Sequence, residues 1–192
     1  MNREHKIRHE LTRLVAWREW AAFDRRMGDL CLVEGYLLQA SSEWLLIHRT
    51  DDFHLYGYYL IRARDITRIR TNGAFQRILQ REGILQQVGM SFPLDVESEQ
   101  TILQGVKKNG MLVILDFDYY PDNYLYIGKP LRVNKRTVAF RWFDASGIWQ
   151  DDPAQIDYSD ISSIELCTEY INVFEKYLHC KVKRASRKKG SH

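Results

Sequence analysis

The chain has 192 residues and a formal net charge of +3, and 45% of its residues are hydrophobic and 28% charged. These proportions are typical of a globular protein with one average domain or two small ones, and they exclude collagenous, low-complexity and broadly disordered chains. No apolar run approaches the roughly 20 residues of a membrane-spanning helix. The charged N-terminal segment lacks the apolar stretch of a secretory signal, and three widely spaced cysteines fit a reducing compartment, so we expect a cytoplasmic protein without a membrane role.

Basic charge is concentrated at the C-terminal end. Residues 181–192 carry six basic side chains and no acidic one, so the remainder of the chain is net negative. These side chains are Lys181, Lys183, Arg184, Arg187, Lys188 and Lys189. They are candidate contacts to nucleic acid or another anionic surface through salt-sensitive attraction. The alternative interpretation is a disordered, solubilising tail.

The predicted elements begin with a helix within residues 3–26, where Ile7, Leu11 and Leu14 share one helical stripe and residues 19–23 also look helical. Apolar residues that alternate at a spacing of two then predict a run of strands before a second helix. The strands are predicted at 30–39, 44–50 and 58–63, and the helix at 74–82.

A connector is predicted over residues 84–96, because glycine and proline punctuate it. Asp95 is predicted to cap a helix over 97–108. The strands predicted after that helix are 111–118, 124–133, 137–143 and 155–158, and the last helix is 169–179. The pattern therefore predicts the same succession of strands and a closing helix twice.

An internal repeat underlies this succession. At an offset of 93 residues, Gly35 to Leu38 aligns with Gly128 to Leu131, and at an offset of 95 the pair Asp65-Ile66 aligns with Asp160-Ile161. Identities are sparse, but the apolar positions coincide, which is the pattern of a duplicated structural unit.

Each copy resembles a small Sm-like or SH3-like barrel, because a glycine bends a long strand that is followed by a tight turn, two more strands and an Asp-Ile corner. The resemblance covers residues 33–82 and 127–178. It implies an α+β, mostly β protein of two tandem small barrels, each followed by a short helix, with an additional N-terminal helix. The expected divisions are residues 1–83 with the first barrel, the connector at 84–96, residues 97–180 with the second barrel, and the basic tail at 181–192. Completion of the first barrel by residues 8–25 or by residues 84–88 stays open.

The segments Ser42–His48 and Asp51–Tyr58 also resemble a stretch common in uncharacterised bacterial proteins. That resemblance implies no activity. Likeness to Sm-like barrels implies RNA or protein binding by analogy alone, because small barrels support many unrelated functions.

No catalytic or cofactor motif occurs in the chain: GxSxG, a phosphate loop, GxGxxG, HExxH and paired CxxC are all missing. His5 and His9 have the spacing of two ligands on one helical turn, but no third ligand accompanies them, and a solvated surface is the favoured interpretation. We therefore expect a protein that is not an enzyme and has no cofactor or metal.

A carboxylate cluster lies at Asp116, Asp118 and Asp122, where a predicted strand runs into a turn. A divalent cation or an acid–base pair is one interpretation. The favoured interpretation is a hairpin turn with Asp116 and Asp118 facing outward, because Leu115 and Phe117 alternate with them.

Asp65 and Asp160 occupy the same corner in the two copies. Their retention indicates a shared structural demand, because an Asp carboxylate can accept hydrogen bonds from backbone N–H groups one or two residues on. We expect these two residues to hold the corner that redirects the chain.

The strongest candidate binding residues are Arg62, Arg64, Arg68 and Arg70, whose even spacing predicts one basic face on strands. Three interpretations compete: solvated arginines, arginines paired with acidic residues of the second copy or of a partner chain, and arginines that bind phosphates beside Tyr56, Tyr58 and Tyr59. The first two are favoured, because charged strand faces are usually solvated or paired.

The sequence thus predicts a non-catalytic interaction module that binds a protein through a sheet edge or an aromatic groove. The alternative is RNA or single-stranded DNA binding through the four arginines and the basic tail. The identity of the partner and the oligomeric state are left open.

Overall fold

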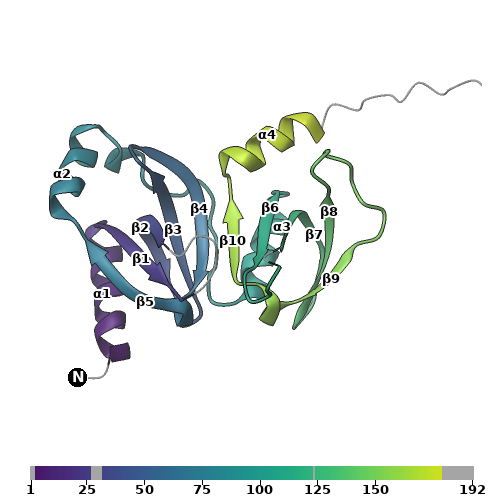
Figure 1. The fold of residues 1–192 in the computed structure, drawn as a ribbon, viewed down its shortest axis with the longest axis horizontal. Helices are drawn as coiled ribbons and strands as arrows, with labels where there is room; N and C mark the ends of the chain where they lie inside the picture. The colour runs from purple at the N-terminus through teal and green to yellow at the C-terminus, as the bar shows by residue number, and fades with distance from the viewer. Residues whose placement is uncertain (1–2, 27–31, 123, 179–192) are drawn as a thin grey trace, which may run out of the picture.

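The computed structural model describes residues 3–26, 32–122 and 124–178, which form an α+β, mostly β fold (Figure 1). Four α-helices accompany ten strands in this part of the chain. The helices are α1 (Arg3–Trp17), α2 (Gly73–Arg81), α3 (Glu99–Lys108) and α4 (Glu169–Leu178). The strands of the N-terminal part are β1 (Trp20–Arg25), β2 (Leu32–Ala40), β3 (Trp44–Asp51), β4 (His54–Arg62) and β5 (Ile66–Thr71). Those of the C-terminal part are β6 (Val113–Phe117), β7 (Tyr124–Val133), β8 (Thr137–Phe143), β9 (Ala154–Asp157) and β10 (Ser163–Leu166). Three short 3-10 helices, η1 (Ala63–Asp65), η2 (Leu85–Gln87) and η3 (Tyr158–Asp160), complete the described elements.

All ten strands belong to one open antiparallel sheet in the order β5-β1-β2-β3-β4-β10-β6-β7-β8-β9. The prediction of two closed barrels is therefore wrong. A closed barrel needs its first and last strands to pair within the same unit. Instead β4 pairs with β10, and β5 and β9 stand at the two ends of the sheet, so hydrogen bonding continues from one unit into the next.

The strand order occurs twice in this sheet. We call residues 3–81 with β1 to β5 the first half, and residues 99–178 with β6 to β10 the second half; the order β5-β1-β2-β3-β4 in the first corresponds to β10-β6-β7-β8-β9 in the second. Gly35 and Gly128 hold equivalent places, since a Cβ atom on either would lie within 2.3 Å of the carbonyl oxygen of the neighbouring strand. A register shift follows each glycine, after Leu37 in β2 and after Pro130 in β7.

The N-terminal helix is shorter than predicted. It ends at Trp17, Arg18 adopts a left-handed backbone with φ of 48°, and β1 starts at Trp20. The Gln76 carboxamide of α2 accepts a hydrogen bond from the Trp20 N–H at 2.5 Å, which fixes this turn. Since β1 pairs with both β2 and β5, it is residues 20–25 that complete the first half, and residues 85–87 form a 3-10 helix instead.

The other predicted helices are confirmed, with small shifts at their ends. The start of α3 differs, because Ser98 and not Asp95 is the capping residue: the Ser98 hydroxyl accepts the Thr101 N–H, and the Thr101 hydroxyl accepts the Ser98 N–H. This reciprocal capping box satisfies two backbone donors that would otherwise lack a partner. The Asp95 carboxylate accepts the Glu97 N–H just before the helix.

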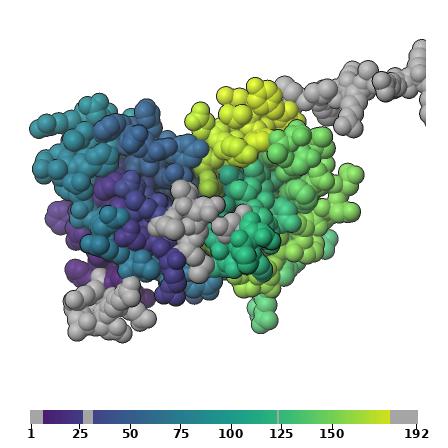
Figure 2. All heavy atoms as spheres, in the orientation of Figure 1, coloured from purple at the N-terminus to yellow at the C-terminus, as the bar shows by residue number. Residues whose placement is uncertain are grey.

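Packing joins the two halves. One core lies within the first half, where Leu11 and Leu14 of α1 pack against the sheet. The largest core combines Trp44, Leu46 and Leu60 of the first half with the buried face of α3 and strands of the second half. Figure 2 shows the two halves in contact along their common boundary. No helix in the described ranges is long and apolar enough to cross a membrane.

Candidate functional site

Arg62, the first of the four predicted binding arginines, lies in the junction between the halves. Its side chain is 2% exposed and its guanidinium carbon lies 4.2 Å from the centre of the Trp44 ring. The Nε atom donates to the carbonyl oxygen of Ile161 at 3.1 Å and the Nη2 atom to that of Tyr158 at 2.6 Å. The Glu99 carboxylate of α3 also accepts from the guanidinium, and the exposed Glu43 carboxylate lies 4.0 Å from its Nη1 atom. These contacts hold the guanidinium within the protein, and Arg62 connects β4 with α3 and the second half.

The four arginines do not share one face, because η1 interrupts the strand between them. Arg62 ends β4, whereas Arg68 and Arg70 belong to β5 at the end of the sheet. Arg64 lies in η1, where its guanidinium carbon is 5.4 Å from the centre of the Tyr119 ring. The prediction of one continuous basic face is therefore wrong.

The corner residues Asp65 and Asp160 each accept a hydrogen bond from a tyrosine. The Tyr119 hydroxyl donates to Asp65 at 2.7 Å, and the Tyr120 hydroxyl donates to Asp160 at 2.8 Å. Asp65 is 4% exposed and lies in η1; Asp160 lies in η3 of the second half. Both corners are braced by the connection between β6 and β7, so the hydrogen-bond donors are phenols instead of the expected backbone N–H groups.

The outer side of β5 is the most accessible candidate binding surface. We call Ile66–Thr71 the β5 edge; among the described strands it pairs only with β1. Ile69 is half-buried against the first-half core, while Arg68 and Arg70 alternate with it toward solvent. Arg70 makes a 2.7 Å ion pair with Asp24, and the side chain of Arg68 has no ion pair or hydrogen bond to the described residues. Among the described strands, none pairs with the outer side of residues 68–71, and positive charge flanks this stretch of the β5 edge.

The opposite end of the sheet is acidic. We call Ala154–Asp157 the β9 edge; among the described strands it pairs only with β8. Asp151 and Asp152 precede it on the surface, and Asp157 ends it. Hydrogen bonds from the backbone N–H and the hydroxyl of Ser159 lower the pKa of Asp157, so this carboxylate stays ionised. The two free edges of the sheet thus carry opposite charge.

The carboxylate predicted to face outward at Asp116 lies instead in a polar cluster at the junction. The Ser163 hydroxyl donates to Asp116 at 2.7 Å, and the Tyr59 hydroxyl lies 3.2 Å from the Ser163 hydroxyl. Burial, followed by the nearby charge of Glu165, raises the pKa of Asp116 to about 7. No group of three histidine, cysteine, aspartate or glutamate side chains in the described ranges is placed to hold a metal ion.

Replacement of Asp116 by asparagine should stabilise the protein at neutral and alkaline pH. Because the folded-state pKa of about 7 lies above the ordinary 3.8, the folded protein holds a proton that the unfolded chain has released, and stability falls as pH rises through this window. We expect Asp116→Asn to raise the free energy of unfolding by about 1–2 kcal/mol near pH 8 and to leave it unchanged near pH 4, as urea titrations at both pH values can measure.

The control for this substitution is Asp122→Asn, which alters an exposed carboxylate of the same connection. It should change stability at neither pH. If Asp116→Asn destabilised the protein equally at both pH values, an ionised Asp116 would be favourable in the fold and the assignment above would be incorrect.

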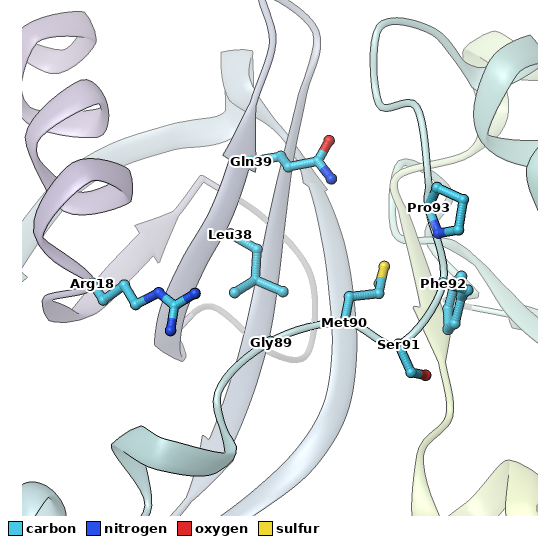
Figure 3. Close-up of a pocket in the computed structure, with 8 residues that line it drawn as sticks. All are labelled: Arg18, Leu38, Gln39, Gly89, Met90, Ser91, Phe92 and Pro93. Carbon is cyan, nitrogen blue, oxygen red and sulfur yellow. The ribbon is translucent and has the colours of Figure 1, made fainter.

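A surface hollow of about 510 Å³ lies between β2 and the connector (Figure 3). Arg18, Leu38 and Gln39 line one side of it and Gly89 to Pro93 the other. The eight lining residues include no carboxylate, histidine, cysteine or lysine, so the hollow presents no acid–base pair from the part of the chain that the structure describes. The sequence did not indicate this hollow, because it forms only where the connector crosses β2.

The connector is fastened beside this hollow. The Gly89 N–H donates to the Nδ1 atom of His48 at 3.3 Å, and the Tyr58 hydroxyl donates to the Gly89 carbonyl at 2.8 Å. The rings of His48 and Tyr58 lie 4.5 Å apart, and burial lowers the pKa of His48 to about 4. A neutral imidazole can accept the Gly89 N–H, so the connector is held through both backbone polar groups of one residue, Gly89.

Six candidate basic residues of the tail lie outside the described residues: Lys181, Lys183, Arg184, Arg187, Lys188 and Lys189. The side chains of His5, Cys31 and Cys180 also lie outside the described part of the chain. The expectations for the tail stay predictions.

Comparison with known proteins adds no constraint on this site. No protein-family model, curated protein or solved structure matches the chain.

Proposed function

We propose that the protein is a non-catalytic interaction module that takes up an extended, acidic segment of a protein partner on the β5 edge. The observation that carries this proposal is a six-residue strand with one strand neighbour, whose solvent-facing side chains include Arg68 and Arg70. An extended segment can add to such an edge through main-chain hydrogen bonds, while the arginines select for acidic side chains. In this proposal the protein acts in the cytoplasm without a cofactor, as its sequence features support.

The three tyrosines that the sequence offers for base stacking beside the arginines make other contacts. Tyr59 is 3% exposed, Tyr58 packs on His48, and the guanidinium carbon of Arg49 lies 5.0 Å from the centre of the Tyr56 ring. Base stacking requires an open aromatic face. Since Arg62 is also buried, the protein-binding interpretation is the better supported one.

The test is binding of a fluorescein-labelled peptide in which aspartate alternates with valine, followed by fluorescence anisotropy. We expect the native protein to bind and the double variant Arg68→Glu with Arg70→Glu to lose about tenfold or more in affinity, because charge complementarity becomes repulsion. Amide hydrogen exchange at residues 68–71 should slow when the peptide is bound, since strand addition protects edge amides.

The matched control reverses two exposed charges on α3, Lys107→Glu with Lys108→Glu, and should bind the peptide as the native protein does. Equal affinity of the native protein and the β5 variant would exclude the β5 edge. Binding of a labelled single-stranded oligonucleotide in place of the peptide, with a steep dependence on salt, would replace this proposal with nucleic-acid binding.

A further inference from the structure

We infer that the β5 edge receives the β9 edge of a second copy of this chain, so that copies associate head to tail. The inference rests on the proposed function, because it names the partner of the same edge. It extends the sheet of one molecule into the next through the two strands that stand at its ends.

The first support is the place of the free strands in the repeated order. In the first half the end strands are β5 and β4, and in the second half the corresponding strands are β10 and β9. The chain joins its halves by pairing β4 with β10. By the repeat, β9 corresponds to β4 and β5 corresponds to β10. The pairing of β4 with β10 inside the chain is therefore a model for pairing of β9 with β5 between two copies.

The second support is a register that the internal junction specifies. Within the chain, Leu60 pairs with Ile164 and Ile61 with Ser163. At the offset of 95 residues, these pairs correspond to Gln155 with Ile69 and to Ile156 with Arg68. Pro153 corresponds to Tyr58, and because proline has no N–H the intermolecular pairing should end there.

The third support is charge. In this register Ala154 is opposite Arg70, which brings Asp151 and Asp152, in the loop just before β9, close to the positive charge of Arg70. Two β5 edges repel each other, as do two β9 edges, whereas β5 with β9 brings opposite charges together. The contact is therefore heterologous, and repetition of it gives a ring or a filament.

The outer edges are more polar than the internal junction. At the offset of 95 residues, Gln155 in β9 corresponds to Leu60 in β4, and Arg70 in β5 corresponds to Glu165 in β10. Such a contact buries less apolar surface than β4 with β10, so it should form reversibly and weaken as salt is added.

The test is sedimentation equilibrium of the full chain with two charge-reversed variants. We expect the mean mass of the native protein to rise with concentration, and both Arg68→Glu with Arg70→Glu and Asp152→Arg with Asp157→Arg to remain monomeric. A mixture of the two variants should associate again, because each supplies the charge that the other has lost. Recovery on mixing also shows that both variants are folded.

The control Lys107→Glu with Lys108→Glu should associate like the native protein. A native protein that stays monomeric at every concentration yet binds the acidic peptide would overturn this inference and leave the proposed function intact. Loss of both self-association and peptide binding would overturn both. Self-association that survives in each charge-reversed variant would place the contact on another surface and overturn the inference.

Discussion

Substitution of Arg62 by methionine should lower the free energy of unfolding by about 3 kcal/mol or more. The side chain is 2% exposed and supplies donors to two carbonyl oxygens and to the Glu99 carboxylate. Methionine retains the apolar stem over Trp44 but leaves a carboxylate and two carbonyls without their charged partner. Urea unfolding followed by tryptophan fluorescence measures the loss.

Two comparisons make this result specific. Arg68→Met removes an exposed arginine and should change stability by less than about 0.5 kcal/mol. Glu99→Met combined with Arg62→Met should recover part of the loss, because no uncompensated carboxylate remains. A single Arg62→Met variant as stable as Arg68→Met would mean that the junction does not depend on this guanidinium.

Substitution of Gly128 by alanine should also cost about 3 kcal/mol or more, through overpacking against a backbone that has no room to move. The added Cβ atom would lie 1.9 Å from the carbonyl oxygen of Arg141 in β8. Relief requires β7 and β8 to separate at the centre of the second half. Thermal unfolding followed by circular dichroism should show a large decrease in Tm.

Gly73→Ala is the matched control, because its Cβ atom would meet nothing closer than the Arg77 side chain at 3.7 Å at the start of α2. It should be neutral or stabilise the protein by about 0.5–1 kcal/mol, since alanine loses less backbone entropy than glycine on folding. Equal Tm values for the two alanine variants would contradict the close approach of β7 and β8.

The strands could largely be predicted from the sequence, because alternation of apolar residues with polar ones follows directly from burial of one face. β1 was missed for the same reason: Trp20 to Phe23 is buried throughout, so it shows no alternation, and its two alanines favour a helix. The equivalence of Gly35 and Gly128 was visible because close backbone approach excludes every other residue at both places.

The open sheet could not be predicted, because it depends on contacts between residues about one hundred positions apart. The alternation of apolar and polar residues is compatible with two closed barrels and also with the pairing of β4 with β10. Only the packing of Leu60 and Trp44 into the second-half core distinguishes the two arrangements. The site had the same difficulty. Even spacing of arginines indicates one face only where the strand is continuous, and the turn at Ala63–Asp65 separates Arg62 from Arg68.

The attachment of the connector at Gly89 has a mechanical consequence. Two units joined by a flexible linker can change their relative orientation. In this protein His48 and Tyr58 hold the connector by hydrogen bonds at Gly89, and β4 pairs with β10 across the boundary between the halves. The two halves are consequently held at one fixed orientation, so the amino-acid sequence determines the angle between the two ends of the sheet. An assembly of many copies, joined end to end, takes its curvature from that angle.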